Sequence, residues 1–436
     1  MPYILILVGI MAGALTNENL LMIPLLLVIS AAILLLAGVH QVPVSDRKFL
    51  FLLAVGALLI RLILIVSTHC FETSFIQYVK TSDAIYYEQI GRLIAEAWHN
   101  GTHLDINKNN FGYQYWNGII YYFAGFKPDL VIIINSIASV CIGLNLYFIA
   151  LKLSGPKAAK ISYALAIYYP SAILWSSLNL KDSLVIFLIT LIVKHTLELI
   201  EEYKLGRLLL ISLLLMALVT MRFYAGILIA ICIALSYIFA ASKFPWLQRI
   251  AYSFAIVIIA GFVLQQMGYG FMGTDYILSQ NFETIGEQHQ NAAYGEGAFA
   301  EDVQFDSFFD ALKYLPIGVF YFLFAPFPWQ SIGAIRILAV PEMLFLYFLY
   351  SYFIAGFKQI WRTQRGACLF LLLFILAFGL IYSLGSANIG GVYRVRLQVI
   401  MVAFIFISTG MQNSWALNKI FGRFTKKNYP NQPTCL

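Results

Sequence analysis

One acidic residue stands at the start of an amphipathic stretch and is the first candidate for acid–base chemistry. Asp83 opens this stretch, and apolar side chains then recur with helical spacing over residues 90–98. That spacing predicts a helix lying along a membrane surface, with Asp83 in its first turn. An aspartate there can cap the helix, or it can act as a general base that takes a proton from a hydroxyl group. Tyr87 would share the helical face of Asp83, whereas Glu88 would not.

A small set of basic residues is the second candidate group. These residues fall within long apolar runs or on the side of the membrane where positive charge is scarce; they are Arg61, Lys181, Arg222, Arg394 and Arg396, with Arg336 as a further member. A single cation of this kind can simply reach a lipid headgroup. For a cluster we favour function, because ionisable groups are costly at membrane depth. Arginine forks and lysine ammonium groups bind phosphate oxygens, so the cluster predicts a phosphate site. Arg394 and Arg396 would point the same way if their segment were extended. Asp182, next to Lys181 at the start of a span, is placed to cap that helix.

Membrane-spanning helices must hold these residues in place. Apolar residues make up 61% of the chain and charged residues 11%, whereas a soluble domain is nearer half apolar and a quarter charged. Most apolar runs are roughly 18–25 residues long, enough to cross about 30 Å of hydrocarbon. They lie at 20–39, 49–68, 130–151, 161–177, 183–199, 208–220, 223–241, 251–267, 367–384 and 399–410, with a weaker run at 2–15 and two or three more within 314–357. The predicted fold is all-α, a polytopic transmembrane bundle of about twelve or thirteen spans.

Lysine and arginine residues in alternate short loops give this bundle an orientation. Basic loops carry Arg47 and Lys48, Lys204 and Arg207, and further pairs along the chain, which marks their side as cytoplasmic. The net charge of +7 is thereby explained without a nucleic-acid partner. Two long loops, 69–127 and 269–308, then lie outside, and the second contains seven acids and no lysine or arginine.

In one region the predicted number of spans does not bring the chain to the expected side of the membrane. An odd number of crossings must separate the loop 269–308 from the basic loop at Lys358, yet residues 314–357 resemble two spans. Prolines at 326 and 328 would break a helix. A re-entrant or interfacial piece around residues 325–329 would restore the alternation.

The sequence divides into three expected parts. Residues 1–48 form a membrane hairpin, residues 49–412 form the main transmembrane domain with its two outer loops, and residues 413–436 form a basic cytoplasmic tail.

His99 and His103 have the spacing of metal ligands on a helix, but Asn100-Gly101 interrupts the helix between them. We therefore expect no metal site and no cofactor, with a divalent cation as the open alternative.

Four segments carry a family resemblance. They are Asp83-Ala84-Ile85-Tyr86-Tyr87, the aromatic stretch 112–125, the segment from Tyr169-Pro170-Ser171 through Trp175 to Lys181-Asp182, and the segment from Asn388 to Arg396. In this order the chain resembles the GT-C glycosyltransferases, in the branch of glycosyltransferase family 39 that includes protein O-mannosyltransferases and the bacterial aminoarabinose transferase. The resemblance covers roughly residues 49–410.

The resemblance implies an enzyme of the bacterial plasma membrane with its active site on the extracytoplasmic side. It would move a sugar from a polyprenyl-phosphate donor to a glycan, lipid or protein acceptor by inverting displacement. Asp83 would be the catalytic base, and the donor phosphate would be bound by Lys181, Arg394 and Arg396. Arg222 joins them only through the predicted topology, and Arg61, Tyr87 and Glu88 are possible supports.

Two other functions stay open at this stage. A polymerase or ligase of lipid-linked glycans, of the O-antigen or exopolysaccharide type, would also need cations at the outer face, and its donor would carry a pyrophosphate. A lipid or glycan flippase would be favoured by charges at mid-membrane and by inverted repeats. Few such charges and no such repeats are evident in the sequence.

Overall fold

The computed structural model describes the chain in segments. They are residues 42–70, 82–104, 111–202, 204–239, 282–293, 297–300, 307–330 and 336–412, with residues 258, 261, 262, 265, 303, 305 and 414 in addition. Most of the predicted hairpin 1–48, nearly all of the run 251–267 and almost all of the tail 413–436 lie outside these residues.

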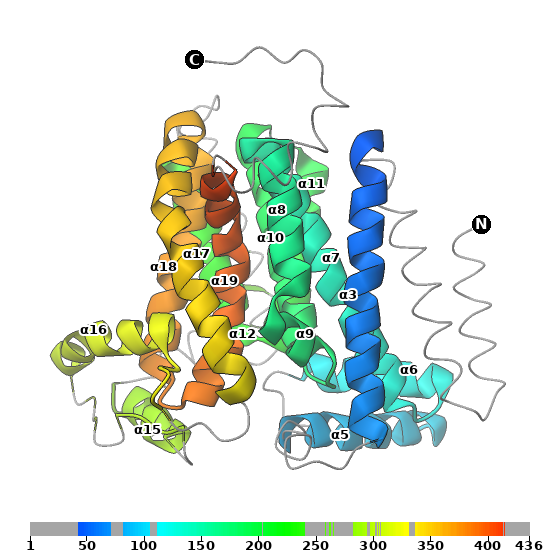
Figure 1. Ribbon diagram of the computed structural model, residues 1–436. Coiled ribbons are helices and arrows are strands. Elements are labelled where there is room, and N and C mark those ends of the chain that lie inside the picture. The colour runs from blue at the N-terminus through cyan, green and yellow to red at the C-terminus, as the bar shows by residue number, and fades with distance from the viewer. Residues whose placement is uncertain are drawn as a thin grey trace.

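Within the described segments the regular structure is helical, as predicted. The long upright helices are α3 (Val44–Cys70), α7 (Pro128–Ser154), α10 (Asp182–Glu201), α17 (Arg336–Thr363), α18 (Arg365–Gly385) and α19 (Ile389–Met411). These six are long and apolar enough to cross a membrane. Between them stand shorter helices, namely α8 (Pro156–Tyr168), α9 (Pro170–Ser176), α11 (Leu205–Met221) and α12 (Phe223–Phe239). The predicted polytopic membrane bundle is thus confirmed (Figure 1).

Four further helices lie at one end of the bundle, which we call the α5 end. They are α5 (Ser82–His99), α6 (Gly112–Ala124), α15 (Phe282–Ala292) and α16 (Phe308–Phe324). Figure 1 shows α5, α6 and α16 lying across the direction of the upright helices. The helices of both predicted outer loops therefore occupy the same end of the molecule, as the alternation of basic loops requires.

The prediction of at least two spans within 314–357 was wrong. Among the described residues of this region only α17 is long and apolar enough to cross, and α16 lies crosswise at the α5 end (Figure 1). Its first turns carry Asp310 and an exposed Lys313, and Ser307 Oγ accepts a hydrogen bond from the Asp310 backbone N–H. The crosswise element of this region is α16, which begins at Phe308, upstream of residues 325–329 where a re-entrant or interfacial piece was predicted. A single crossing then restores the alternation of sides.

The predicted run 161–177 is broken into α8 and α9 at Tyr169-Pro170. Two buried side chains, Arg61 and Glu342, form hydrogen bonds with the backbone at this break. Proline at the first position of α9 cannot continue the ladder of α8. The freed Ser171 N–H donates to Glu342 at 2.6 Å, and the Ile167 carbonyl accepts from Arg61 at 3.0 Å. Such side-chain partners are what allow a broken helix at membrane depth.

Helix α19 is the most buried of the six long spans. Gly356 of α17 and Gly410 of α19 let these two backbones meet closely, because a Cβ on either would collide with a carbonyl of the other helix. The N-terminus of α19 is capped by Asn388, whose Oδ1 accepts from the Gly390 N–H at 2.8 Å. The cap fixes where helical geometry begins, and hence the direction of the arginines that follow.

Candidate functional site

Asp83 lies in the first turn of α5 and reaches the interior cluster from the α5 end. Its side chain is 52% exposed, and its Oδ2 accepts a hydrogen bond from Arg394 Nη1 at 2.7 Å. The helix begins one residue earlier, at Ser82, as the amphipathic pattern predicts. The first-loop acid and one of the out-of-place arginines are therefore direct partners.

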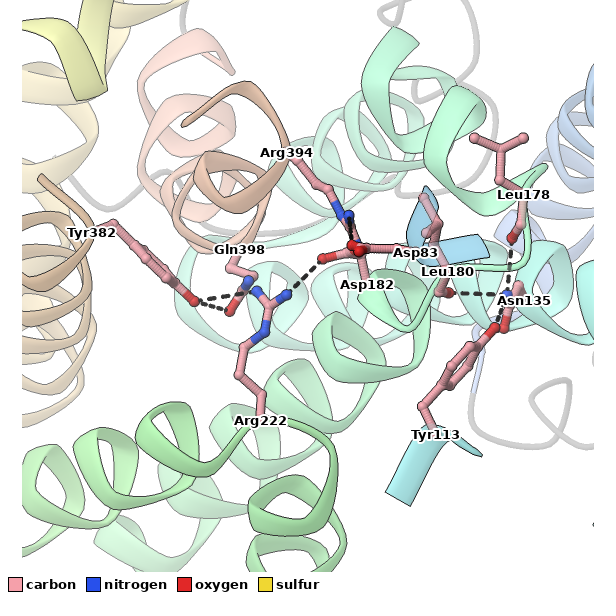
Figure 2. Close-up of polar contacts among 10 residues, drawn as sticks. All are labelled: Asp83, Tyr113, Asn135, Leu178, Leu180, Asp182, Arg222, Tyr382, Arg394 and Gln398. Carbon is pink, nitrogen blue, oxygen red and sulfur yellow. Dashed lines mark hydrogen bonds and ion pairs between the residues drawn. The ribbon is translucent and has the colours of Figure 1, made fainter. Parts of the chain in front are cut away.

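Arg394 bridges two carboxylates. Its Nε lies 2.5 Å from Asp182 Oδ2, while its Nη1 holds Asp83. The other oxygen of Asp182 lies 3.0 Å from Arg222 Nη2. Figure 2 shows the resulting chain of alternating charges, Asp83, Arg394, Asp182 and Arg222. Its members come from α5, α19, α10 and the one-residue junction between α11 and α12.

A polar pair lies at the inner end of this chain. Arg222 Nη1 lies 3.5 Å from the Tyr382 hydroxyl, which in turn donates to Gln398 Oε1 at 2.7 Å. Both Arg222 and Gln398 are buried. The guanidinium of Arg222 is thereby held from both sides, so it presents a fixed charge rather than a flexible one.

Lys181 completes the cluster. It directly precedes Asp182, and its Nζ lies 5.9 Å from the ring centre of Tyr87 on α5. Burial, followed by the nearby positive charge of Arg222, lowers the pKa of Lys181 to about 7, although Asp182 opposes this shift. Lys181 thus adds a buried cation whose charge is disfavoured by its burial and by the neighbouring Arg222 guanidinium.

Asp182 is the member that sequence reasoning misassigned. As a helix cap it would have faced its own backbone, but the cap position belongs to Lys181, and Asp182 is the first residue of α10. Its side chain is almost fully buried between two guanidinium groups. The only signal in the sequence was an acid next to a lysine at the start of a span.

Arg396 does not join the cluster. Residues 389–411 are helical, so Arg394 and Arg396 are separated by about 200° around α19 rather than aligned. The guanidinium of Arg396 is buried on the far face, where Nη1 donates to the Phe322 carbonyl at 3.1 Å and to the Ala325 carbonyl. The prediction that the two arginines point the same way was wrong, because it assumed an extended segment.

Two of the possible supports are also placed away from the cluster. Arg61 is fully buried within the bundle, where it donates to Ser139 Oγ and Ser176 Oγ, each at 2.8 Å. Glu88 is partly exposed on α5. Burial and, next, the Glu88 carboxylate raise the pKa of Tyr121. Tyr87, in contrast, lies beside Lys181 as its predicted helical face requires. The side chain of Arg336 is outside the described residues.

The described part of the chain contains no group of three or more histidine, cysteine or acidic side chains placed to hold a metal. His99 instead stacks on Tyr122, with ring centres 4.5 Å apart.

Comparison with known proteins gives a structural match. No family model matches the sequence, and no curated protein does. Among solved structures, the crystal structure of ArnT from Cupriavidus metallidurans bound to undecaprenyl phosphate is similar, with a TM-score of 0.51 and 11% identity. The match covers 86% of this chain and 62% of the ArnT chain, so this chain spans less than two thirds of that protein. The likeness shows that the bundle shares the fold of that ArnT structure.

Proposed function

We propose that this protein is a membrane glycosyltransferase that moves a sugar from a polyprenyl-phosphate donor to an acceptor hydroxyl. The observation that carries the proposal is the contact between Asp83 and Arg394. A base and a leaving group must lie on either side of one sugar, so the acid and the phosphate-binding cations have to be close neighbours. The 2.7 Å ion pair between Asp83 and Arg394, in a chain whose fold is similar to that of ArnT, supports this arrangement.

The charges of the cluster suit a phosphodiester donor. Lys181, Arg222 and Arg394 contribute three positive charges when Lys181 is protonated, and Asp83 and Asp182 contribute two negative ones, which leaves one positive charge. A sugar linked to polyprenyl phosphate carries one negative charge at its phosphate. The bound donor would therefore balance the site, and the phosphate would compete with Asp83 for Arg394.

That competition would prepare the base. In this structure the Asp83 carboxylate is engaged by Arg394 Nη1. Once the phosphate of the sugar donor accepts the hydrogen bond of this nitrogen in place of Asp83, the Asp83 carboxylate is free to contact the acceptor hydroxyl. The base would then act mainly when a donor is in place, which limits hydrolysis of the donor by water.

The reaction would be a direct displacement. Asp83 takes the proton of the acceptor hydroxyl, whose oxygen attacks the anomeric carbon from the face opposite the phosphate. The bond between that carbon and the phosphate oxygen breaks, and polyprenyl phosphate leaves with the electron pair. Lys181 and Arg394 stabilise the charge that grows on the leaving phosphate, which is typically the largest contribution to such catalysis. The anomeric configuration is inverted.

The α5 end places this chemistry at the rim of the bundle. Helix α5 lies across that end (Figure 1), and the exposed side chains of Ile85, Tyr86 and Leu93 suit contact with lipid headgroups and acyl chains. A lipid-linked donor would thus reach the cluster from the membrane. We assign this end to the extracytoplasmic side of a bacterial plasma membrane, on the basis of the basic loops at the opposite end.

The donor class can be tested in membrane vesicles that contain the protein. Vesicles receive a labelled sugar linked either to polyprenyl monophosphate or, as an oligosaccharide, to polyprenyl pyrophosphate. Transfer from the monophosphate donor alone is the expected result. Transfer from the pyrophosphate donor alone would replace the proposal with a polymerase or ligase.

A further inference from the structure

A side chain of α7 binds two backbone carbonyls of the segment that presents Lys181 and Asp182. Residues 177–181 join α9 to α10, and two of their carbonyls, those of Leu178 and Leu180, face Asn135 in α7 (Figure 2). Asn135 Nδ2 lies 3.1 Å from the first carbonyl oxygen and 3.0 Å from the second. The side chain is fully buried in a mostly apolar stretch of α7.

The orientation of the Asn135 amide follows from its partners. Backbone carbonyls can only accept, so the NH₂ group must face Leu178 and Leu180. The Tyr113 hydroxyl accepts from the same nitrogen at 2.8 Å and donates to Asn179 Oδ1 at 2.7 Å. Within the described residues, Asn135 Oδ1 has no partner. A buried amide oxygen without a partner costs stability. The contribution of Asn135 therefore comes from its NH₂ group, whose two hydrogens are shared among three acceptors, the two carbonyls and the Tyr113 hydroxyl.

The same network reaches the helix that carries Asp83. The ring of Tyr113 packs edge-on against Tyr87, with ring centres 4.8 Å apart, and Tyr87 in turn lies beside Lys181 Nζ. Asn179 Nδ2 also donates to Asn117 Oδ1 of α6 at 2.8 Å. One hydrogen-bonded unit therefore contacts both the α5 face that bears the acid and the segment that bears the cation.

We propose that Asn135 is a positioning residue, which holds the Leu178 and Leu180 carbonyls and thereby sets the place of Lys181 and Asp182 relative to Asp83. The importance of that place for catalysis rests on the function proposed above. Asn135 lies in α7, and its hydrogen bonds go to the segment 177–181 and to Tyr113, so it acts on the charged cluster through these neighbours.

Loss of the two N–H groups would change the surroundings of Lys181. The charged and titratable groups that face it are Asp83 and Tyr87 of α5, Asp182 of α10, Arg222 between α11 and α12, and Arg394 of α19. Held in this place, Lys181 has a pKa of about 7, mainly because it is buried. A loosened segment would let water reach the ammonium group, and its pKa would move toward the ordinary value of about 10.4.

The test compares Asn135→Leu with Asn145→Leu in the full-length protein. Leucine has nearly the shape of asparagine but no N–H groups. Asn145 is a matched control, because it is buried in the same helix about 15 Å further along and donates to Thr190 Oγ1 at 3.1 Å, away from residues 177–181. Each protein is labelled with trace acetic anhydride from pH 6 to 11, and acetylation of Lys181 is followed by mass spectrometry.

The expected result is a labelling midpoint for Lys181 that rises by at least one pH unit in Asn135→Leu and stays unchanged in Asn145→Leu. An unchanged midpoint in Asn135→Leu would overturn the proposal. If Asn135→Leu does not fold, Asn135→Ala decides in its place, because it removes the same two N–H groups with a smaller side chain, and an unchanged midpoint for Lys181 would then overturn the proposal.

A second measurement separates this inference from the proposed function. Binding of undecaprenyl phosphate is measured for the wild type and for both leucine variants, with at least tenfold weaker binding expected for Asn135→Leu only. Absence of binding by the wild type would contradict the proposed function, while the labelling of Lys181 would still decide the role of Asn135. Equal binding by all three proteins would overturn the positioning role.

Discussion

Arg394 and Asp83 form an ion pair of 2.7 Å although 311 positions separate them in the chain. One belongs to the last described span and the other to the crosswise helix α5. Arg394 uses a second nitrogen for Asp182, so a single guanidinium joins the partly exposed acid to the buried one. This bridge determines what each charge can do, and the predictions below depend on it.

The Arg394→Ala variant should bind undecaprenyl phosphate weakly and transfer sugar slowly. Loss of one donor to a developing negative charge typically costs about 10²–10³ in rate. Arg394→Lys should recover only part of this, because an ammonium group cannot hold two carboxylates as a fork does. The control is Arg92→Ala, which removes an exposed pair with Glu96 on the same crosswise helix that carries Asp83. Equal binding by Arg394→Ala and Arg92→Ala would place the phosphate elsewhere.

Asp182→Asn should lower the thermal stability of the protein. Asp182 is buried between two guanidinium groups, and removal of one partner from a buried pair typically costs about 3–5 kcal/mol. The melting temperature in detergent is the measurement. Asp310→Asn, which breaks an exposed pair with Lys313, should change it little. A melting temperature of Asp182→Asn equal to that of the wild type would contradict the buried network.

Binding of the sugar-linked phosphodiester donor should weaken as the pH rises through about 7. Lys181 has its pKa lowered to about 7 by burial and then by Arg222, so it is charged below this pH and neutral above it. A neutral amine no longer attracts the phosphate, whose single charge is constant in this range. The dissociation constant is measured from pH 6 to 9 for the wild type and for Lys181→Arg. The arginine stays charged and should remove the dependence. A flat profile for the wild type would exclude Lys181 from the donor site.

Arg396→Gln should destabilise the protein without weakening donor binding in the fraction that remains folded. Its guanidinium donates hydrogen bonds to the carbonyls of Phe322 and Ala325 at the end of α16, on the face of α19 opposite Arg394. Melting temperature and undecaprenyl phosphate binding are measured on the same preparation. A loss of binding with an unchanged melting temperature would return Arg396 to the phosphate site.

The bundle itself could be predicted from the sequence because a membrane span is a local property. Length and apolar composition identify α7, α10 and α18, and no contact between distant residues is needed to recognise them. The start of α5 at Ser82 followed from spacing alone for the same reason. In contrast, α16 is as apolar as a short span, and only its crosswise packing shows that it does not cross (Figure 1).

The candidate site could be predicted only in part. Lys181, Arg222 and Arg394 were found because a cation in an apolar chain is conspicuous. Asp182 was misassigned because its partner Arg394 lies 212 positions away, and no local pattern indicates that contact. Arg396 was grouped wrongly with Arg394, since the start of α19 depends on the cap formed by Asn388. Asn135 did carry a signal, as a polar residue in the middle of an apolar run.

Sugar transfer by the Asp83→Asn variant is the most direct test of the central claim. Asparagine keeps the size of the side chain and a hydrogen-bond acceptor for Arg394, but it cannot take a proton. Transfer from a labelled polyprenyl-phosphate sugar should fall by about 10²–10⁴, while binding of undecaprenyl phosphate and the melting temperature stay near those of the wild type. Transfer at the wild-type rate by folded Asp83→Asn would show that Asp83 is not the base, and the account of the site would be wrong.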